Sequence, residues 1–290
     1  MLITRRSFVS DMSRIGLLVG AASIMNGVSF LMPRAADGVD VNRDENLDFG
    51  LKACVVGVGQ AGLAITSQLQ FDQPAHRLPV MHLDRDHALV SRVLASSHLV
   101  FMAGSIKDPA LDALRTLAAD LGVSLLVLFE DMPEISGIAH SLSPSDRECV
   151  VPLNRRTEFG MASTVISEIY GALALPGLVC MDFADVHDVL SGIICRTYTL
   201  VAADIKTGIR VFRERLDITR TLSKVDGGLV ILSTDHNRQE PLESYLEFEE
   251  ELHRHVRPDA NIFWCANVLG AMPEGFRMTV IAGQRPNSGI

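Results

Sequence analysis

A short apolar run that ends in closely spaced glycines constrains the fold of this chain more than any other feature. Residues 51–58 are apolar apart from Lys52 and are rich in β-branched side chains, and a helix-forming run follows at residues 63–69. A buried strand, a glycine turn and a helix form one unit of a parallel α/β sheet. The same geometry directs backbone N–H groups toward a phosphate at the start of the helix. The candidate phosphate-binding residues of this turn are Gly57, Gly59, Gln60, Ala61 and Gly62.

Further apolar runs alternate with amphipathic segments along the rest of the chain. Strands are predicted at residues 78–83, 98–104, 123–129, 192–201, 227–232, 259–267 and 276–283. Helices are predicted at residues 111–121, 159–175, 182–190, 207–222 and 243–256. This alternation is typical of an α/β protein with helices on both faces of its sheet.

Length, charge and cysteine content exclude several classes of function. The 290 residues are enough for one large or two modest domains. The net charge of −9 disfavours a nucleic-acid partner. The five cysteines are scattered without CxxC spacing, so we interpret them as buried small apolar residues and predict no metal site.

The first 34 residues form a predicted leader. The segment Thr4-Arg5-Arg6-Ser7-Phe8-Val9 precedes an apolar run at residues 15–32 and resembles a twin-arginine export signal. Three interpretations stay open: an export leader that is cleaved or kept as a membrane anchor, a cytoplasmic amphipathic or buried helix, and a wrongly assigned start. Residues 35–47 are polar and predict a linker. We predict a membrane-associated protein and favour the exported side over the cytoplasm.

Residues 176–186, PGLVCMDFADV, carry two carboxylates three positions apart, Asp182 and Asp185. Such a pair is typical of a solvated helix start, where acids favour the positive end of the helix dipole. The stretch also resembles the synergy loop of the FtsZ/tubulin superfamily of filament-forming GTPases. In that family the loop reaches into the nucleotide pocket of the next subunit, and its acids polarise the water that attacks the γ-phosphate. The resemblance implies this role in trans for Asp182 and Asp185.

The resemblance extends over residues 51–283. The segment GVGQAGLAI resembles the first phosphate loop of the family, and the strands at 259–267 and 276–283 resemble its last strands. It implies an FtsZ/tubulin-like α/β fold with a parallel Rossmann-like sheet, a long central helix and a smaller mixed α/β C-terminal domain. The implied boundaries are residues 48–175 for the nucleotide-binding-like domain and 176–290 for the C-terminal domain. The resemblance further implies that Asn154 lies near the ribose and that Phe159 and Ser163 contact guanine.

The chain departs from the family at its phosphate loops. Leu63 stands where the family has glycine or asparagine, and Gly104 is the one residue kept of a seven-residue glycine signature. Asp108 adds negative charge where a triphosphate would lie. Residues 85–97 are too few to contain the family's other glycine-rich loop. We therefore predict that GTP or GDP binds weakly or not at all and that the chain needs no cofactor.

These observations favour a pseudo-GTPase: a non-catalytic scaffold or subunit at a membrane that acts through contacts with protein partners, either FtsZ or itself. The alternatives are a regulator or cap of FtsZ filaments that acts through Asp182 and Asp185, and a diverged polymerising GTPase. A Rossmann-type NAD enzyme is disfavoured because nothing downstream of Asp182 supplies a catalytic set.

Overall fold

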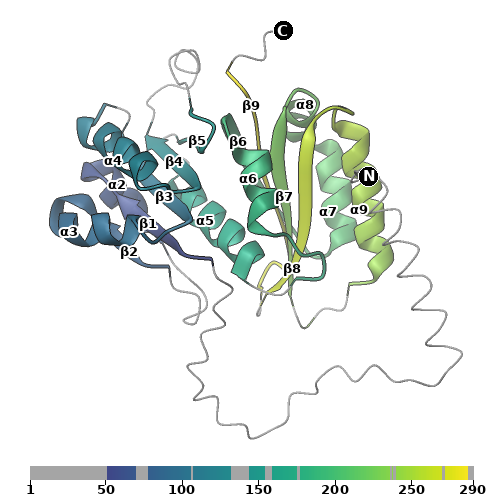
Figure 1. Ribbon diagram of the computed structural model, residues 1–290. Coiled ribbons are helices and arrows are strands. Elements are labelled where there is room, and N and C mark those ends of the chain that lie inside the picture. Colours follow the sequence, from purple (N-terminus) through teal and green to yellow (C-terminus); the bar gives the residue numbers. More distant parts are fainter. Residues whose placement is uncertain are drawn as a thin grey trace, which may run out of the picture. The chain divides into compact units, whose positions relative to one another are not determined.

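The computed structural model describes residues 51–69, 78–105, 107–131, 144–153, 159–174, 177–235, 237, 240–269 and 272–286 (Figure 1). The side chains of residues 84–87, 130, 131 and 159 are not part of the description. The predicted leader at 1–34, the linker at 35–47 and Asn154 lie outside the described residues. Residues 48–290 form one compact unit. Within the described part of the chain, every helix is too short or too polar to cross a membrane.

Five parallel strands form the first half of the sheet, in the order β2-β1-β3-β4-β5. The strands are β1 (Ala53–Gly57), β2 (Val80–His82), β3 (Leu99–Gly104), β4 (Leu125–Asp131) and β5 (Glu148–Leu153). The helices between them are α2 (Gly59–Thr66), α3 (Leu83–Leu94) and α4 (Pro109–Asp120). Successive residues of these strands are buried on opposite faces, since Phe101 belongs to the core under α2 and Met102 to the core under α3 and α4. The sheet is therefore covered on both sides, as a parallel sheet requires.

The second half continues the same sheet with the strand order β6-β9-β7-β8. Its elements are α5 (Phe159–Ala174), α6 (Phe183–Leu190), β6 (Ile193–Ala202), α7 (Ile205–Glu214), α8 (Leu216–Leu222), β7 (Gly227–Asp235), α9 (Leu242–His255), β8 (Asn261–Leu269) and β9 (Phe276–Gln284). Strand β9 is antiparallel to both of its neighbours, which makes this half mixed. The cores place α5 and α6 on one face and α7, α8 and α9 on the other. The predicted α/β fold class, with a parallel sheet, a long central helix and a mixed second half, is confirmed.

The two halves of the sheet meet at a short seam between β5 and β6. The register joins only Cys149 to Ile193 and Val150 to Ile194, whereas β6 pairs with β9 from Ile194 to Ala202. Helix α5 lies beside this seam in Figure 1, and its buried residues belong to a core that contains buried side chains of both halves. Apolar contacts of α5 therefore supply much of the attachment that strand pairing does not.

Two local predictions are wrong at the level of elements. The predicted helix at 207–222 is interrupted at Arg215, whose φ of −82° and ψ of 79° are not helical. The Arg215 guanidinium instead donates to both Asp217 carboxylate oxygens, at 2.8 and 2.7 Å, across the start of α8. The strand predicted at 78–83 covers only Val80–His82, and Leu83 is already the first residue of α3. A strong i,i+3/i+4 pattern does not show where one helix stops and the next begins.

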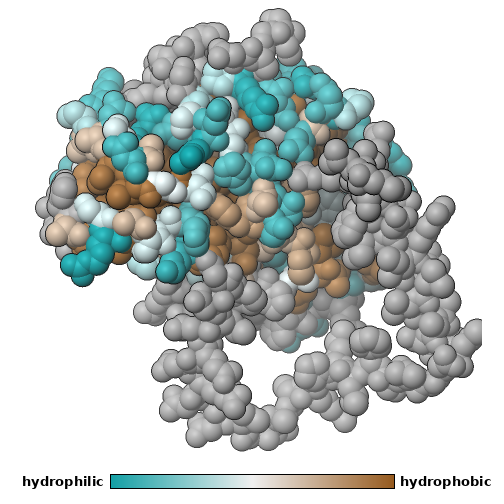
Figure 2. Space-filling view, viewed as in Figure 1, coloured by the Kyte–Doolittle hydropathy of each residue, from teal (hydrophilic) through white to brown (hydrophobic). Residues whose placement is uncertain are grey.

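The visible surface has both hydrophilic and apolar areas. Figure 2 shows hydrophilic residues over most of its upper part, with apolar residues gathered in separate areas at the left and lower middle. The exposed large apolar side chains include Leu178 and Val268, on neighbouring segments, and Leu216 at the start of α8. Scattered apolar side chains of this kind are normal on the surface of a folded domain.

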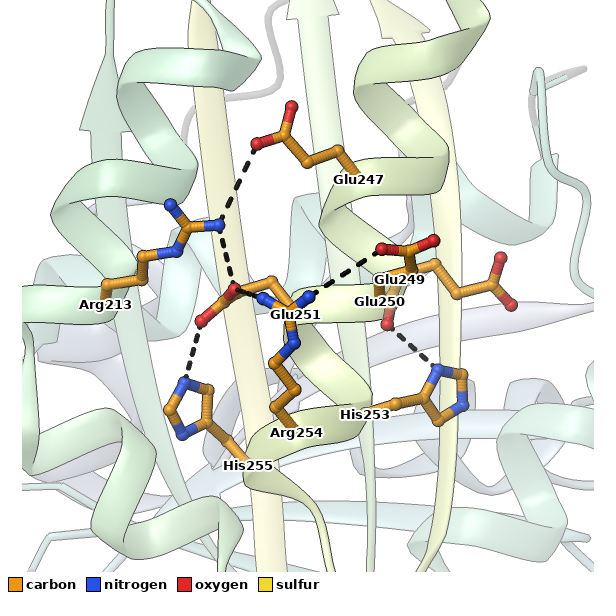
Figure 3. A network of polar contacts seen from close by, with 8 residues as sticks. All are labelled: Arg213, Glu247, Glu249, Glu250, Glu251, His253, Arg254 and His255. Carbon is orange, nitrogen blue, oxygen red and sulfur yellow. Dashed lines mark hydrogen bonds and ion pairs between the residues drawn. The ribbon is translucent and has the colours of Figure 1, made fainter.

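Helices α7 and α9 are joined by a charged cluster around Glu251 (Figure 3). The Glu251 side chain is only 5% exposed, and its carboxylate lies 2.9 Å from Arg213 and 2.7 Å from Arg254. His255, one turn further along α9, contacts the same carboxylate at 3.0 Å. Burial raises the pKa of Glu251, but hydrogen bonds from Arg213 and His255 and the charges of the two arginines outweigh it, so the pKa is lowered.

We expect Glu251→Gln to lower the free energy of unfolding by about 2 kcal/mol at about pH 7, because charged hydrogen bonds are lost. A carboxyl whose pKa is lower in the folded state stabilises the fold above its unfolded pKa and loses that effect as pH falls through the folded pKa. The difference between variant and wild type should therefore shrink as pH falls below about 4 in urea denaturation. Glu249→Gln is the control, since the Glu249 side chain lies apart from the arginines in Figure 3. A pH-independent difference would contradict the assignment.

Candidate nucleotide site

The glycine turn has the local geometry of an anion-binding helix start. Strand β1 ends at Gly57 and α2 begins at Gly59, with Val58 between them. The Val58 N–H donates to the Ala103 carbonyl at 2.8 Å, and the Gly62 N–H donates to the Val58 carbonyl at 3.1 Å. The three N–H groups between them precede the first helical hydrogen bond and are directed beyond the start of the helix. An anion placed there would meet these donors and the positive end of the helix dipole.

Two glycines of the turn are explained by the fold itself. Gly59 has a φ of +60°, which side chains other than glycine rarely adopt. A Cβ on Gly62 would lie 2.8 Å from the Gly57 carbonyl carbon and closer still to the Ala103 carbonyl oxygen. Helix α2 thus approaches β1 and β3 too closely for any side chain at Gly62. The fold therefore requires glycine at positions 59 and 62 whether or not a phosphate binds.

The position in front of the turn is taken by a carboxylate of the chain. Asp108 is the N-cap of α4, and its Oδ1 accepts a hydrogen bond from the Ala110 N–H at 3.0 Å. Its Oδ2 lies in the space that a Cβ on Gly59 would enter. The Asp108 carboxylate therefore stands at the starts of two helices, α2 and α4. Negative charge is favourable at both, and it would repel a phosphate approaching the turn.

The chain after β3 is too short to wrap a triphosphate. Four residues separate Gly104 from Pro109, the first residue of α4. This connection is a tight turn, in which the Asp108 N–H donates to the Ser105 carbonyl at 2.8 Å. A Cβ on Gly104 would lie 3.2 Å from Leu111 Cδ1, so an apolar side chain packs against the remaining glycine.

The other nucleotide-contact predictions are only partly described by the structure. Phe159 opens α5, as predicted, but its side chain is not among the described ones. Ser163, also on α5, is half-buried. His82 was missed: its Nδ1 would lie 3.0 Å from a Cβ on Gly57, beside the turn. Its place near the carboxyl end of the strand predicted at 78–83 was the available signal.

Asp182 and Asp185 form a reciprocal capping box at the start of α6. Asp182 Oδ1 accepts from the Asp185 N–H at 2.9 Å, and the Asp182 N–H donates to Asp185 Oδ2 at 3.2 Å. The helix-start interpretation of this pair is confirmed. The glycine turn lies at the carboxyl edge of the parallel strands, where α5 begins, and the acids follow the other end of α5. A sixteen-residue helix is about 24 Å long, so one chain does not bring the acids to its own turn.

The described residues contain no group of three or more His, Cys, Asp or Glu side chains arranged to hold a metal ion. Four cysteines are buried and unpaired, as predicted, whereas the prediction is wrong for Cys180, which is exposed. Cys180 precedes the α6 capping box, where a loop rather than a core element presents it to solvent.

Comparisons with known proteins identify the fold. No family model matches the sequence, and no curated protein is significantly similar to it. Among solved structures, a point variant of FtsZ from M. jannaschii matches with a TM-score of 0.60 at 12% identity, over 80% of this chain and 91% of that one. TubZ from Bacillus thuringiensis serovar israelensis, in GDP-form protofilaments, matches with a TM-score of 0.52 at 10% identity, over 80% and 86% of the two chains. CetZ2 from Haloferax volcanii, in a GTPγS-bound protofilament, matches with a TM-score of 0.52 at 13% identity, over 81% and 93%.

These structures superpose on this chain over most of both chains. Identities of this size show the fold alone. This chain has the FtsZ/tubulin-like fold.

Proposed function

We propose that this protein is a non-catalytic, FtsZ-like scaffold or subunit that acts through protein–protein contacts at a membrane. The observation that carries the proposal is the Asp108 carboxylate in front of Gly59, at the start of α2. Phosphoryl transfer depends on donors and cations that surround the phosphates. A fixed carboxylate at the first phosphate-binding turn opposes that arrangement. The connection after β3 is too short to surround the phosphates with further donors.

Self-association is the contact that the structural neighbours favour. TubZ and CetZ2 are described as protofilaments, and a further M. jannaschii FtsZ structure as an empty dimer. A second copy of this chain or an FtsZ subunit is therefore the proposed partner. The twin-arginine-like segment at residues 1–34 supports the membrane part of the proposal.

The test is a GTP titration of three proteins: the wild type, Asp108→Ser and Asp120→Asn. Serine keeps an N-cap for α4 but removes the charge in front of α2. Asp120→Asn removes an equal charge from the other end of the same helix. We expect wild type and Asp120→Asn to bind GTP with a Kd above about 1 mM. We expect Asp108→Ser to bind about tenfold more tightly, because the like charge is gone.

Two results would contradict this view. Micromolar GTP affinity of the wild type would reject the pseudo-GTPase proposal as a whole. Equal affinity of Asp108→Ser and wild type would show that the carboxylate is not what opposes the phosphate.

A further inference from the structure

A layer of polar side chains lies between α5 and the mixed half of the sheet. Glu168 of α5 is almost fully buried and accepts hydrogen bonds from Ser233 of β7 at 2.5 Å and from Arg277 of β9 at 3.2 Å. Thr279 lies two residues beyond Arg277 and therefore on the same face of β9. Thr199 of β6 is its direct cross-strand partner. Asn267 of β8 faces the same side, because it is the register partner of Ser233.

Three polar atoms in this layer lack a partner within the described part of the protein. They are Thr199 Oγ1, Thr279 Oγ1 and Asn267 Nδ2, all shielded from bulk solvent. The same description contains only two other such atoms, on Ser191 and Ser244. Native proteins rarely leave buried polar groups unsatisfied, and bound water is the usual partner where protein atoms do not supply one. The concentration of these atoms on one face therefore points to a ligand in that layer.

The spacing of these atoms suits water. Directly opposed residues of antiparallel strands have Cβ atoms about 5 Å apart. Two hydroxyls on such a pair that do not bond to each other are within reach of one bridging water. Asn267 is one strand away from Ser233, whose hydroxyl already contacts Glu168. The Glu168 carboxylate has lone pairs left to accept a further donor.

Within this layer, Thr199 lies closer to bulk solvent than Thr279 does. The pairing of β5 with β6 ends at Ile194, before Thr199 is reached. The Thr199 residue as a whole is only half-buried, whereas Thr279 behind it is fully buried. We infer that water reaches the layer from the Thr199 side.

We propose that the layer between α5 and the mixed half of the sheet binds ordered water, with one molecule shared by Thr199 and Thr279 and another shared by Asn267 and Glu168. A water that bonds to both hydroxyls couples the effects on stability of replacing either threonine. If one threonine is replaced by valine, the water loses a partner and the remaining hydroxyl is left unsatisfied. If both are replaced, no hydroxyl is left without a partner.

The test is a double-mutant cycle in urea with Thr199→Val, Thr279→Val and the double variant. We expect each single variant to raise the unfolding equilibrium constant about fivefold, and the double variant to be no less stable than either single one. Thr116→Val is the control, since its hydroxyl bonds only to the Asp112 carbonyl on the exposed side of α4. Stabilisation by either single variant, with additive effects in the double variant, would mean that no water bonds to the two hydroxyls. This result would overturn the proposal.

A high-resolution crystal structure gives an independent reading. We expect density for a water within hydrogen-bond distance of both threonine hydroxyls, and for another between the Asn267 amide and the Glu168 carboxylate. Continuous protein packing with no water at either place would overturn the proposal.

Discussion

Replacing Gly62 by alanine is expected to lower the free energy of unfolding by about 3 kcal/mol, at the upper end for overpacking a core. The added methyl group would meet main-chain atoms of Ala103 and Gly57, which cannot rotate away as a side chain can. Helix α2 would have to move off β1 and β3, and this movement would disturb the core that contains Ile65 and Phe101. Urea denaturation followed by circular dichroism measures the loss.

Gly160→Ala is the matched control. A Cβ at Gly160, in the first turn of α5, would have no atom within 4 Å. Alanine there should stabilise the protein by about 0.5–1 kcal/mol through helix propensity. Equal stability of Gly62→Ala and wild type would show that the glycine is not required for packing, and would return it to consideration as a phosphate-contact residue.

Replacing Arg277 by methionine is expected to lower the free energy of unfolding by about 3–4 kcal/mol at about pH 7, because it leaves a buried carboxylate without its cation. The Glu168 side chain is 2% exposed, and Ser233 is its other hydrogen-bond partner. Burial raises the pKa of Glu168, even though Ser233 and Arg277 both oppose that effect. A carboxyl with a raised folded pKa is most favourable below its unfolded pKa and becomes less so as pH rises through the folded pKa. The loss should therefore shrink toward about pH 4.

The double variant Glu168→Met with Arg277→Met should recover most of the lost stability, since apolar side chains of similar size replace a buried ion pair at little cost. Glu274→Gln serves as the control, because Glu274 also contacts Arg277 but is 20% exposed. A double variant as unstable as Arg277→Met alone would show that the arginine stabilises through packing of its stem rather than by compensating Glu168.

The strands and the central helix could be predicted because their signals are local. Runs such as the one ending at Gly57 are fully apolar, which only a strand buried on both faces tolerates. The pattern from Phe159 onward continues until Pro176, which limits the helix. The helix-start interpretation of Asp182 and Asp185 also needed only a spacing of three. The break at Arg215 could not be predicted, because it depends on a side-chain contact with Asp217 that competes with helix continuation.

The candidate site was harder to predict because its main feature is a contact between separate elements. The sequence indicated that Asp108 adds charge after the third strand, but its position over Gly59 follows from parallel pairing of β1 with β3. The role of Gly62 in packing is invisible without the neighbouring strand. Glu168 and Arg277 are 109 positions apart, and neither lies in a recognisable motif. Contacts of this kind are set by the tertiary fold rather than by local pattern.

The brevity of the β5–β6 seam has a mechanical consequence. Two residue pairs of backbone pairing resist tension far less than the nine-residue ladder between β6 and β9. A force that pulls the two halves apart would open the sheet at Cys149 and Val150 first, while each half keeps its own ladders. Helix α5 would then act as a tether, and the molecule would yield in a defined place instead of unravelling from an end.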